Sequence, residues 1–431
     1  MPLRSHLAVV ALVIGSGWSC ATESGGPNRR VETVDSAGVT IVRNLYAGFD
    51  TLAVSLVEDM RIGVTEGPPE YQFFRIFGLT VDALGRTFVS NGGTRSVRVY
   101  AADGQWVRDI GRQGSGPGEF QGISAPAIWR DSLAVFDPQE LRFALFDTAG
   151  QFLAAWPLVL PDQRVVYPLK GGPDGWTIWV NQRGSSIRDQ PVGAVTLDTV
   201  WLGHARLADL ASVINRGTSL DSAVFGMVPW PSTPAKWTAG DDGPIGWLPL
   251  FAPDRRWALD DVGRIYLSAG YPYQIDVIDG AGNHARRITR SFAERPVTDA
   301  EVDDYLGRLA AAPPGPFSQR QLDNARHQAD THRAEFFSVT GALIASADGE
   351  IWIQRLDVRF DVGNHEYLPD FTPGPRYWDV LDGSGQYQYT VRMPDRFTPR
   401  WIGSGSVVGV LRDENDVEHV ARFRVERLPE S

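Results

Sequence analysis

The chain has 431 residues, of which 43% are hydrophobic and 11% aromatic, so it is long enough to bury a large core. Its 45 glycines and 29 prolines favour many short strands joined by turns over long helices. The formal net charge is −11, and Lys170 and Lys236 are the only lysines among 41 basic residues. An acidic chain without basic clusters is a poor candidate for nucleic-acid binding, because neutralising phosphates supplies most of that affinity.

The N-terminus predicts export. Arg4 precedes an apolar run from Leu7 to Ile14, and small residues then lead to Cys20, the only cysteine. The run is far shorter than the roughly 20 residues that span a bilayer, so we interpret residues 1–20 as a signal peptide. A lipid on Cys20 would hold the protein in the periplasm or at the outer membrane and would be its only membrane contact. The alternative is ordinary cleavage after Ala21, which gives a soluble secreted protein.

Residues 79–120 contain one complete unit of short, alternating strands, with Gly85 and Gly104 at turns that need a positive φ. The outer hairpin of this unit, residues 99–106, recurs at 145–152, 277–284 and 380–387. A period of about 40 to 50 residues is typical of propellers and solenoids. With weaker copies included, we count six units within residues 51–426. Val195 to Asp198 would be the hairpin of a degenerate third unit.

These units predict an all-β fold, a six-bladed β-propeller. Residues 21–50 are expected to form a tether and N-terminal extension. The segment Leu52 to Ile62 would then add the missing strand to the last blade and close the ring, because an open ring leaves unpaired strand edges. The chain is expected to be a monomer.

Two insertions interrupt the repeats. Residues 203–254 are rich in proline and tryptophan. Residues 296–334 predict a helical hairpin, because Thr298 to Glu301 forms a capping box and apolar residues follow at helical spacing from Val302 to Leu309.

The loop from Gly111 to Phe120, GRQGSGPGEF, resembles the connection between blades of NHL-type repeats. From about Leu52 to Val425 the chain is similar to six-bladed propeller lipoproteins of unknown function from environmental bacteria. The resemblance implies the fold and the anchor but no activity, because one fold hosts many functions. The loop lacks the Lys-Ser/Thr pair of a phosphate-binding loop, so we interpret it as a connection.

Three polar residues follow the second strand of successive units: Asn91, Asp137 and Asn181. If their oxygens converged on the channel axis, they would suit Ca²⁺ or another divalent cation. Propeller lactonases that resemble this fold use such sites. The competing interpretation is that each side chain caps its own tight turn by accepting backbone N–H groups.

Trp230, Trp237 and Trp247 lie in the proline-rich insertion, where exposed indoles could bind a ligand. The alternative is that they pack this irregular segment onto its scaffold. No histidine pair has zinc-binding spacing, and no Gly-x-Ser-x-Gly motif occurs. We therefore expect a binding module for a protein or small ligand that has no cofactor and catalyses nothing. The alternatives are a metal-dependent propeller lactonase, hydrolase or lyase, and a purely structural envelope scaffold.

Overall fold

The computed structural model describes most of the chain from residue 31 to residue 427. The described ranges are 31–45, 54–157, 165–172, 175–183, 195–197, 200–206, 226–230, 234–238, 245–247, 249–251, 256–280, 282–311, 318–356 and 376–427. Between residues 156 and 247 the description covers strand backbones and not side chains.

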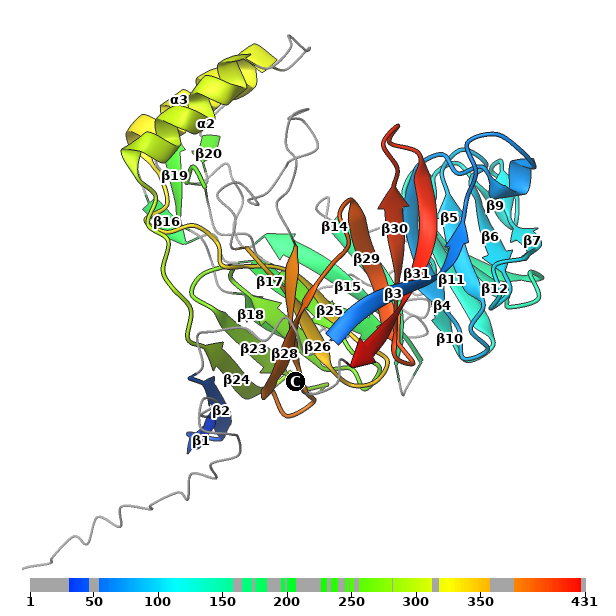
Figure 1. The fold of residues 1–431 in the computed structure, drawn as a ribbon, viewed down its shortest axis with the longest axis horizontal. Coiled ribbons are helices and arrows are strands. Elements are labelled where there is room, and N and C mark those ends of the chain that lie inside the picture. The colour runs from blue at the N-terminus through cyan, green and yellow to red at the C-terminus, as the bar shows by residue number, and fades with distance from the viewer. Residues whose placement is uncertain are drawn as a thin grey trace, which may run out of the picture.

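The chain folds as a series of antiparallel sheets (Figure 1), and six of the described sheets contain a four-strand unit. Sheet 1 has β4 (Ile76–Val81), β5 (Thr87–Asn91), β6 (Ser96–Tyr100) and β7 (Trp106–Ile110). Sheet 2 has β10 (Ala127–Trp129), β11 (Ser132–Asp137), β12 (Arg142–Asp147) and β13 (Phe152–Pro157). Sheet 3 has β14 (Val165–Gly172), β15 (Gly175–Arg183), β17 (Val200–Arg206) and β18 (Gly226–Trp230).

Sheet 4 has β21 (Arg256–Leu259), β22 (Ile265–Ser268), β23 (Gln274–Ile278) and β24 (His284–Arg290), extended by β1 (Val31–Ser36) and β2 (Val39–Asn44). Sheet 5 has β25 (Thr340–Ala345), β26 (Ile351–Arg355), β27 (Tyr377–Leu381) and β28 (Tyr387–Arg392). Sheet 6 has β29 (Phe397–Gly403), β30 (Ser406–Arg412), β31 (Glu418–Arg427) and β3 (Val54–Ile62). First strands of neighbouring sheets touch: β29 contacts β4 and β25, and β10 contacts β4 and β14.

The hairpins at one end of the sheets share one turn chemistry. The carboxylate of Asp82 accepts the backbone N–H groups of Leu84 and Arg86 at 3.0 and 2.8 Å, and the Arg86 Nε at 2.7 Å. Asp260 repeats this pattern with Arg264 in sheet 4. Four other aspartates accept a nearby backbone N–H in turns at this end: Asp103, Asp147, Asp279 and Asp382. Because each aspartate closes its own turn, each hairpin is fixed locally. We call this the turn end, and the opposite end, where consecutive sheets are connected, the loop end.

The glycines predicted at these turns do adopt positive φ, 76° at Gly85 and 85° at Gly104. The same module also buries a phenol in sheet 4. Tyr266 donates to Asp260 at 3.2 Å, and burial, aided by that carboxylate, raises the pKa of Tyr266 to about 12. The turn therefore organises the strand that follows it as well as the hairpin.

An N-terminal hairpin extends sheet 4. β1 and β2 pair antiparallel, and β2 pairs parallel with β24, so residues 31–44 of the expected N-terminal extension belong to the sheet. Asn44, 2% exposed, donates to the carbonyls of Thr289 and Gly385 and accepts the Tyr387 N–H at 2.8 Å. One side chain thus joins sheets 4 and 5. The docking depends on partners far along the chain, which local sequence does not reveal.

The segment expected to complete the last sheet does so. β3 pairs antiparallel with β31, from Val54 opposite Arg427 to Ile62 opposite Val420. Ile62 and Val420 are buried together with the core of sheet 1, so this pairing also packs sheet 6 against sheet 1. The first described strand outside the N-terminal hairpin therefore completes a sheet built mostly from the C-terminus.

The third unit differs from its predicted form. Val195 to Leu197 (β16) pairs with β19 (Pro234–Thr238), which pairs with β20 (Ile245–Trp247), in a separate three-stranded sheet. The outer strands of sheet 3 are β17 and β18 instead, so residues 203–206 and 226–230 of the expected insertion belong to the four-strand unit. The 195–198 segment lacks the turn glycine, and its strand-like pattern does not specify which sheet it joins.

The predicted helices are α2 (Asp299–Ala311) and α3 (Ser318–Thr331), which project from the loop end (Figure 1). The capping box is confirmed, because the Thr298 N–H donates to Glu301 at 3.1 Å. Val302 and Leu309 pack with Phe337, which returns toward the sheets. No helix among the described residues has both the length and the apolar character needed to cross a membrane. The remaining elements are a turn of 3-10 helix, Pro69–Tyr71, and the short parallel pair β8 (Arg112–Gln113) and β9 (Glu119–Phe120).

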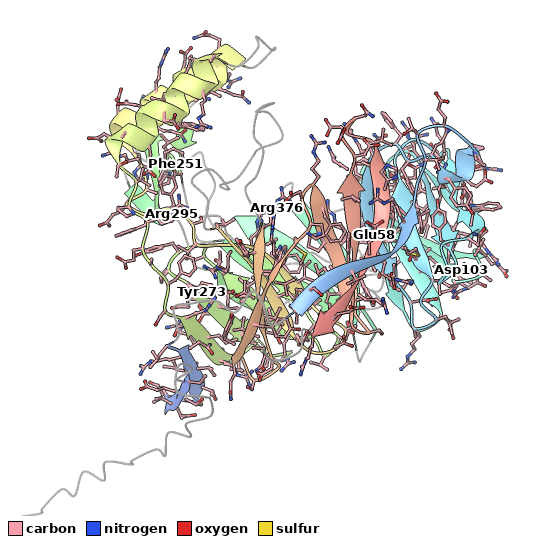
Figure 2. All side chains as sticks on the ribbon, in the orientation of Figure 1. Glu58, Asp103, Phe251, Tyr273, Arg295 and Arg376 are labelled. Carbon is pink, nitrogen blue, oxygen red and sulfur yellow. The ribbon has the colours of Figure 1, made fainter. Side chains whose placement is uncertain are left out.

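A buried polar cluster lies between sheets 4 and 5. Asp379, fully buried, pairs with Arg290 and accepts the hydroxyls of Thr390 at 2.6 Å and Tyr273 at 2.9 Å. Burial, reinforced by this carboxylate, raises the pKa of Tyr273 (labelled in Figure 2) well above its usual value. Satisfying a buried carboxylate with several partners fixes how the two sheets meet, because losing one partner leaves an uncompensated charge.

Replacing Asn44 should weaken the join between sheets 4 and 5. Asn44→Ala removes three hydrogen bonds in a buried position, and we expect the free energy of unfolding to fall by about 2 to 3 kcal/mol. Denaturant melts measure this change. Arg43→Ala, on the same strand but half exposed and only loosely paired with Glu32, is the control and should change stability by less than about 0.5 kcal/mol. Equal effects of the two variants would contradict the role given to Asn44.

Candidate functional site

Asn91 ends β5 and is 1% exposed. Its Oδ1 accepts the Phe74 N–H at 2.9 Å, and its Nδ2 donates to the Thr94 hydroxyl at 3.0 Å. The side chain therefore holds the segment that leads into β4, the first strand of the same sheet.

Asp137 ends β11 and does the same in sheet 2. It is fully buried, and its carboxylate accepts the N–H groups of Gln121 at 2.8 Å and Gly122 at 2.9 Å, in the segment before β10. It also accepts the N–H groups of Gln139 and Glu140 in the following turn. Both side chains thus shape the loop end by holding backbone, as the turn-capping interpretation describes.

The other predicted site residues lie largely outside the described part of the chain. Asn181 is on β15, and Trp230, Trp237 and Trp247 are on β18, β19 and β20, where only the backbone is described. Cys20 precedes the described residues altogether. Among the residues that are described, no three His, Cys, Asp or Glu side chains gather as a metal site would require. The metal site and the tryptophan site therefore stay predictions.

The segment held by Asn91 presents two accessible phenylalanines. Phe74 is 72% exposed and Phe77 44% exposed, and Arg75 between them has a positive φ of 58°. Phe77 is the extra residue of a bulge, because Ile76 pairs with Asn91 while Gly78 pairs with Ser90. Bulges re-aim a side chain out of the regular alternation. The local backbone thus turns an apolar ring outward on a first strand.

Two glycines allow this arrangement. The N–H groups of Gly92 and Gly93 donate to the carbonyls of Arg75 and Phe74 at 2.9 and 3.0 Å. A Cβ on Gly92 would lie 2.8 Å from the Phe77 ring, and one on Gly93 would lie 3.0 Å from the Phe74 Cβ. Side chains at these positions would displace the aromatic residues, so the close approach requires glycine.

Glu418 links this segment to sheet 6. Its carboxylate accepts the Ile76 N–H at 2.6 Å and Arg412 at 2.9 Å. The carboxylate is largely buried, and it joins the first residue of β4 to the first residue of β31. Phe77 is therefore fixed, one residue away, relative to the last sheet.

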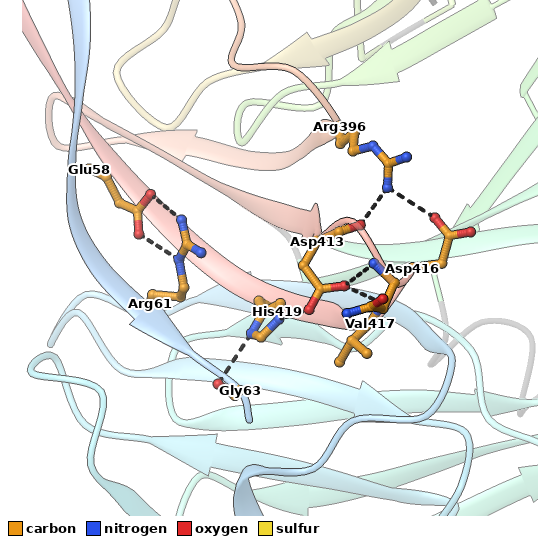
Figure 3. A network of polar contacts seen from close by, with 9 residues as sticks. Glu58, Arg61, Gly63, Arg396, Asp413, Asp416, Val417 and His419 are labelled. Atoms are coloured by element: carbon orange, nitrogen blue, oxygen red, sulfur yellow. Dashed lines mark hydrogen bonds and ion pairs between the residues drawn. The ribbon is translucent and has the colours of Figure 1, made fainter. Parts of the chain in front are cut away.

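His419 continues this contact between the first and last parts of the chain (Figure 3). Its Nδ1 lies 3.1 Å from the Gly63 carbonyl, which can only accept, so this nitrogen donates. Its Nε2 lies 3.4 Å from the Asp413 carboxylate, whose pKa is held low by the Val417 N–H, with help from the Asn415 N–H and His419. Both ring nitrogens face partners, so we interpret His419 as a structural link between β3 and β31.

Arg400 lies on β29, the first strand of sheet 6, which contacts β4. It is the extra residue of a second bulge, between Pro399 and Trp401. Its side chain is exposed. The surrounding protein nevertheless removes part of the water around the guanidinium, and this desolvation lowers its pKa, whereas the Glu418 charge acts in the opposite direction. Solvent access together with lost hydration indicates a partly enclosed position. The described residues offer its side chain no hydrogen bond or ion pair.

The structure thus brings together Phe77, Glu418 and Arg400 at the meeting of sheets 1 and 6, a group that the sequence does not single out. The sequence singles out Asn91 as a metal ligand or as the cap of its own tight turn, and it does not indicate that Asn91 supports the Phe74–Phe77 segment. The sequence gives one partial signal for this site: the Gly92-Gly93 pair is typical of a place where another stretch of backbone approaches closely. The two bulges and the Glu418 contact have no local signature.

No model of a known protein family matches the sequence, and no curated protein matches it. Solved structures do share its architecture. A member of the DUF4221 family from Bacteroides vulgatus is 10% identical, with 88% of this chain and 100% of that chain covered and a TM-score of 0.50. A protein assigned as exported from Bacteroides fragilis is 11% identical, with 89% and 99% covered and a TM-score of 0.46. A streptogramin B lyase is 12% identical, with 88% and 100% covered and a TM-score of 0.42.

At these identities the similarity concerns the fold alone. The chain has a mostly β, propeller-like fold built from consecutive four-strand units. Fold likeness does not decide between binding and catalysis.

Replacing Asn91 separates its structural role from the predicted metal site. Asn91→Ala should lower the free energy of unfolding by about 1 to 2 kcal/mol, because the Phe74 N–H loses its acceptor. Asn91→Asp retains an acceptor oxygen and should recover most of this loss. Melts of each variant with Ca²⁺ and with chelator measure both effects. An unchanged stability of Asn91→Ala would contradict the structural role, and Ca²⁺-dependent stabilisation of the native protein would favour the metal site.

Proposed function

We propose that the chain is an exported, lipid-anchored β-propeller that binds a small ligand without converting it. In this proposal the six four-strand units are the blades of one NHL-type ring, which β3 closes as the outer strand of the last blade. The contacts between first strands and the pairing of β3 with β31 support the ring. The apolar run before Cys20 supports export and anchoring.

The observation that carries the binding function is the pair of accessible phenylalanines on a rigid support. Phe74 and Phe77 are exposed although the backbone beside them is held by Asn91 and Glu418. Exposed aromatic rings on an ordered loop are typical of binding sites, since they offer a large apolar contact at little cost in side-chain entropy.

The surroundings favour a small ligand over a large apolar partner. Phe77 lies on a first strand, and the Arg75 guanidinium lies 6.0 Å from the centre of its ring. Glu418 binds the N–H of the neighbouring Ile76, and β29, which carries Arg400, contacts the strand of Phe77. A site with one apolar surface and a few charged groups suits a small molecule that has an apolar part and a polar end. The predicted Trp230, Trp237 and Trp247 surface would be a second contact region, and a divalent cation remains the alternative that leads to an enzyme.

The test uses a neutral aromatic probe and the chain without residues 1–20. Phenylacetamide should bind the protein weakly, and Phe77→Ala should lower its affinity about three- to tenfold, because one ring contact is lost. Ligand-observed NMR titrations measure the affinity. Leu84→Ala, which removes a 73% exposed apolar side chain at the turn end, is the control and should leave it unchanged. Absence of binding, or equal effects of the two variants, would refute the proposed site.

The anchor is tested in cells that process lipoproteins. The full-length protein should partition with the membrane fraction, whereas Cys20→Ser should appear in the soluble fraction, because the acceptor of the lipid is lost. Mass spectrometry of the mature N-terminus gives the modification directly. An unmodified N-terminus generated by cleavage after Ala21 would show that the protein is secreted without an anchor.

A further inference from the structure

We propose that the polar end of the ligand is an oxyanion, a carboxylate or a phosphate, held by Arg376 and Arg400. This inference rests on the proposed function above and adds the chemical class of the ligand. Its basis is that Arg376 approaches β29 at Thr398, that Arg400 belongs to the same strand, and that β29 contacts β4, the strand that carries Phe77.

Arg376 approaches β29 from sheet 5. It directly precedes β27, and Figure 2 shows it at the end of the sheets from which the helices project. Its Nη1 lies 3.5 Å from the Thr398 hydroxyl, the outer limit for a hydrogen bond. Its Nε is buried and has no hydrogen-bond partner in the described part of the chain. A buried guanidinium donor without an acceptor is costly, so an acceptor on a bound ligand would stabilise this position.

Arg400 lies two residues further along the same strand. Thr398 and Arg400 flank Pro399, whose side chain is buried, and both are more accessible than it. The bulge at Arg400 allows its guanidinium to leave the regular alternation of β29. Two residues of an extended strand span about 7 Å, a distance that long arginine side chains readily bridge to reach one ligand.

The charges of this chain offer many partners to an arginine. With 52 acidic and 41 basic residues, carboxylates are abundant, and several arginines pair with one: Arg86 with Asp82 at 2.7 Å and Arg264 with Asp260 at 2.6 Å. By contrast, neither Arg376 nor Arg400 forms an ion pair with a described residue. Partial burial of unpaired cations lowers stability, and such local conflicts are typical of functional sites.

The carboxylate that acts on Arg400, that of Glu418, does not neutralise the two arginines. Glu418 acts on Arg400 through its charge, but its oxygens are occupied by the Ile76 N–H and by Arg412. The two arginines with Glu418 and Arg412 therefore leave a net positive charge. A guanidinium presents its donors as a planar fork that fits the two oxygens of a carboxylate or phosphate. Phe77 beside it would contact the apolar part of the same ligand.

The experiment compares three probes that differ at one end: phenylacetamide, phenylacetate and phenyl phosphate. With the native chain lacking residues 1–20, at least one of the two anions should bind at least about tenfold more tightly than the amide, as expected for a charged hydrogen-bonded contact. The anion whose affinity exceeds that of the amide by the larger factor shows whether the site prefers a carboxylate or a phosphate. The gain should shrink as salt is raised, because part of it is electrostatic.

Substitutions show which residues produce the tighter binding of the anions. Arg400→Gln and Arg376→Gln should each remove most of the preference for the anion while leaving the affinity for phenylacetamide within about twofold. Arg400→Lys keeps the positive charge but loses the planar fork of donors, so this variant should retain only part of the preference for the anion. Arg396→Gln is the matched control: it removes an equal charge at the loop end, from a residue that contacts Asp413 and Asp416, and should retain the preference.

The outcomes separate this inference from the function it rests on. If the anions bind no better than the amide, or if Arg396→Gln reduces the preference as much as Arg400→Gln does, the oxyanion site is refuted and the aromatic site stands. If no probe binds, both are refuted. Thermal melts of every variant show whether it is folded; should Arg376→Gln or Arg400→Gln not fold, the comparison of the anions with the amide in the native chain decides alone.

Discussion

The structure depends on the pairing of β3 with β31. This pairing brings a strand from the beginning of the described chain into a sheet that is otherwise built from its end, and it covers an edge that would be unpaired. Its consequences extend beyond sheet 6. Ile62 and Val420 are buried with the core of sheet 1, His419 contacts Gly63, and Glu418 binds Ile76. The candidate site lies where these contacts meet, so the closure of the sheet and the geometry of the site have a common origin.

Sequence reasoning succeeded where the determining interactions are local. An aspartate that accepts N–H groups two to four residues ahead, with a glycine at positive φ, recurs in several repeats, so these hairpins are readable from composition and spacing. The capping box at Thr298 is likewise a contact across three residues. The added strand β3 is predicted because residues 52–62 are strand-like and the last unit lacks a strand. In each case the signal and its cause lie within a few residues of each other.

The remaining features could not be read because their causes lie far apart in the chain. Asn44 binds carbonyls more than 200 residues away, so the docking of the β1–β2 hairpin onto the sheets has no local signature. The Val195–Leu197 strand has the right pattern and joins a different sheet, because periodicity specifies a strand but not its partner. Phe77 and Arg400 gain their positions from bulges, where one extra residue shifts the side chain out of the alternation on which prediction relies. The polar residues that the sequence did single out, Asn91 and Asp137, support this surface from beneath.

The N-terminal hairpin has a mechanical consequence. Val31, where β1 begins, lies opposite Asn44, where β2 ends. A pull on the chain ahead of Val31 therefore loads the hairpin at one end and unzips it, breaking one pair of residues at a time. The 6 residues of β1 would release about 20 Å of extended chain before the force reached β2. β2 resists differently: it runs parallel to β24, and Asn44 joins sheets 4 and 5 at its end. β1 thus acts as an extensible segment that protects the sheets from tension at the N-terminus.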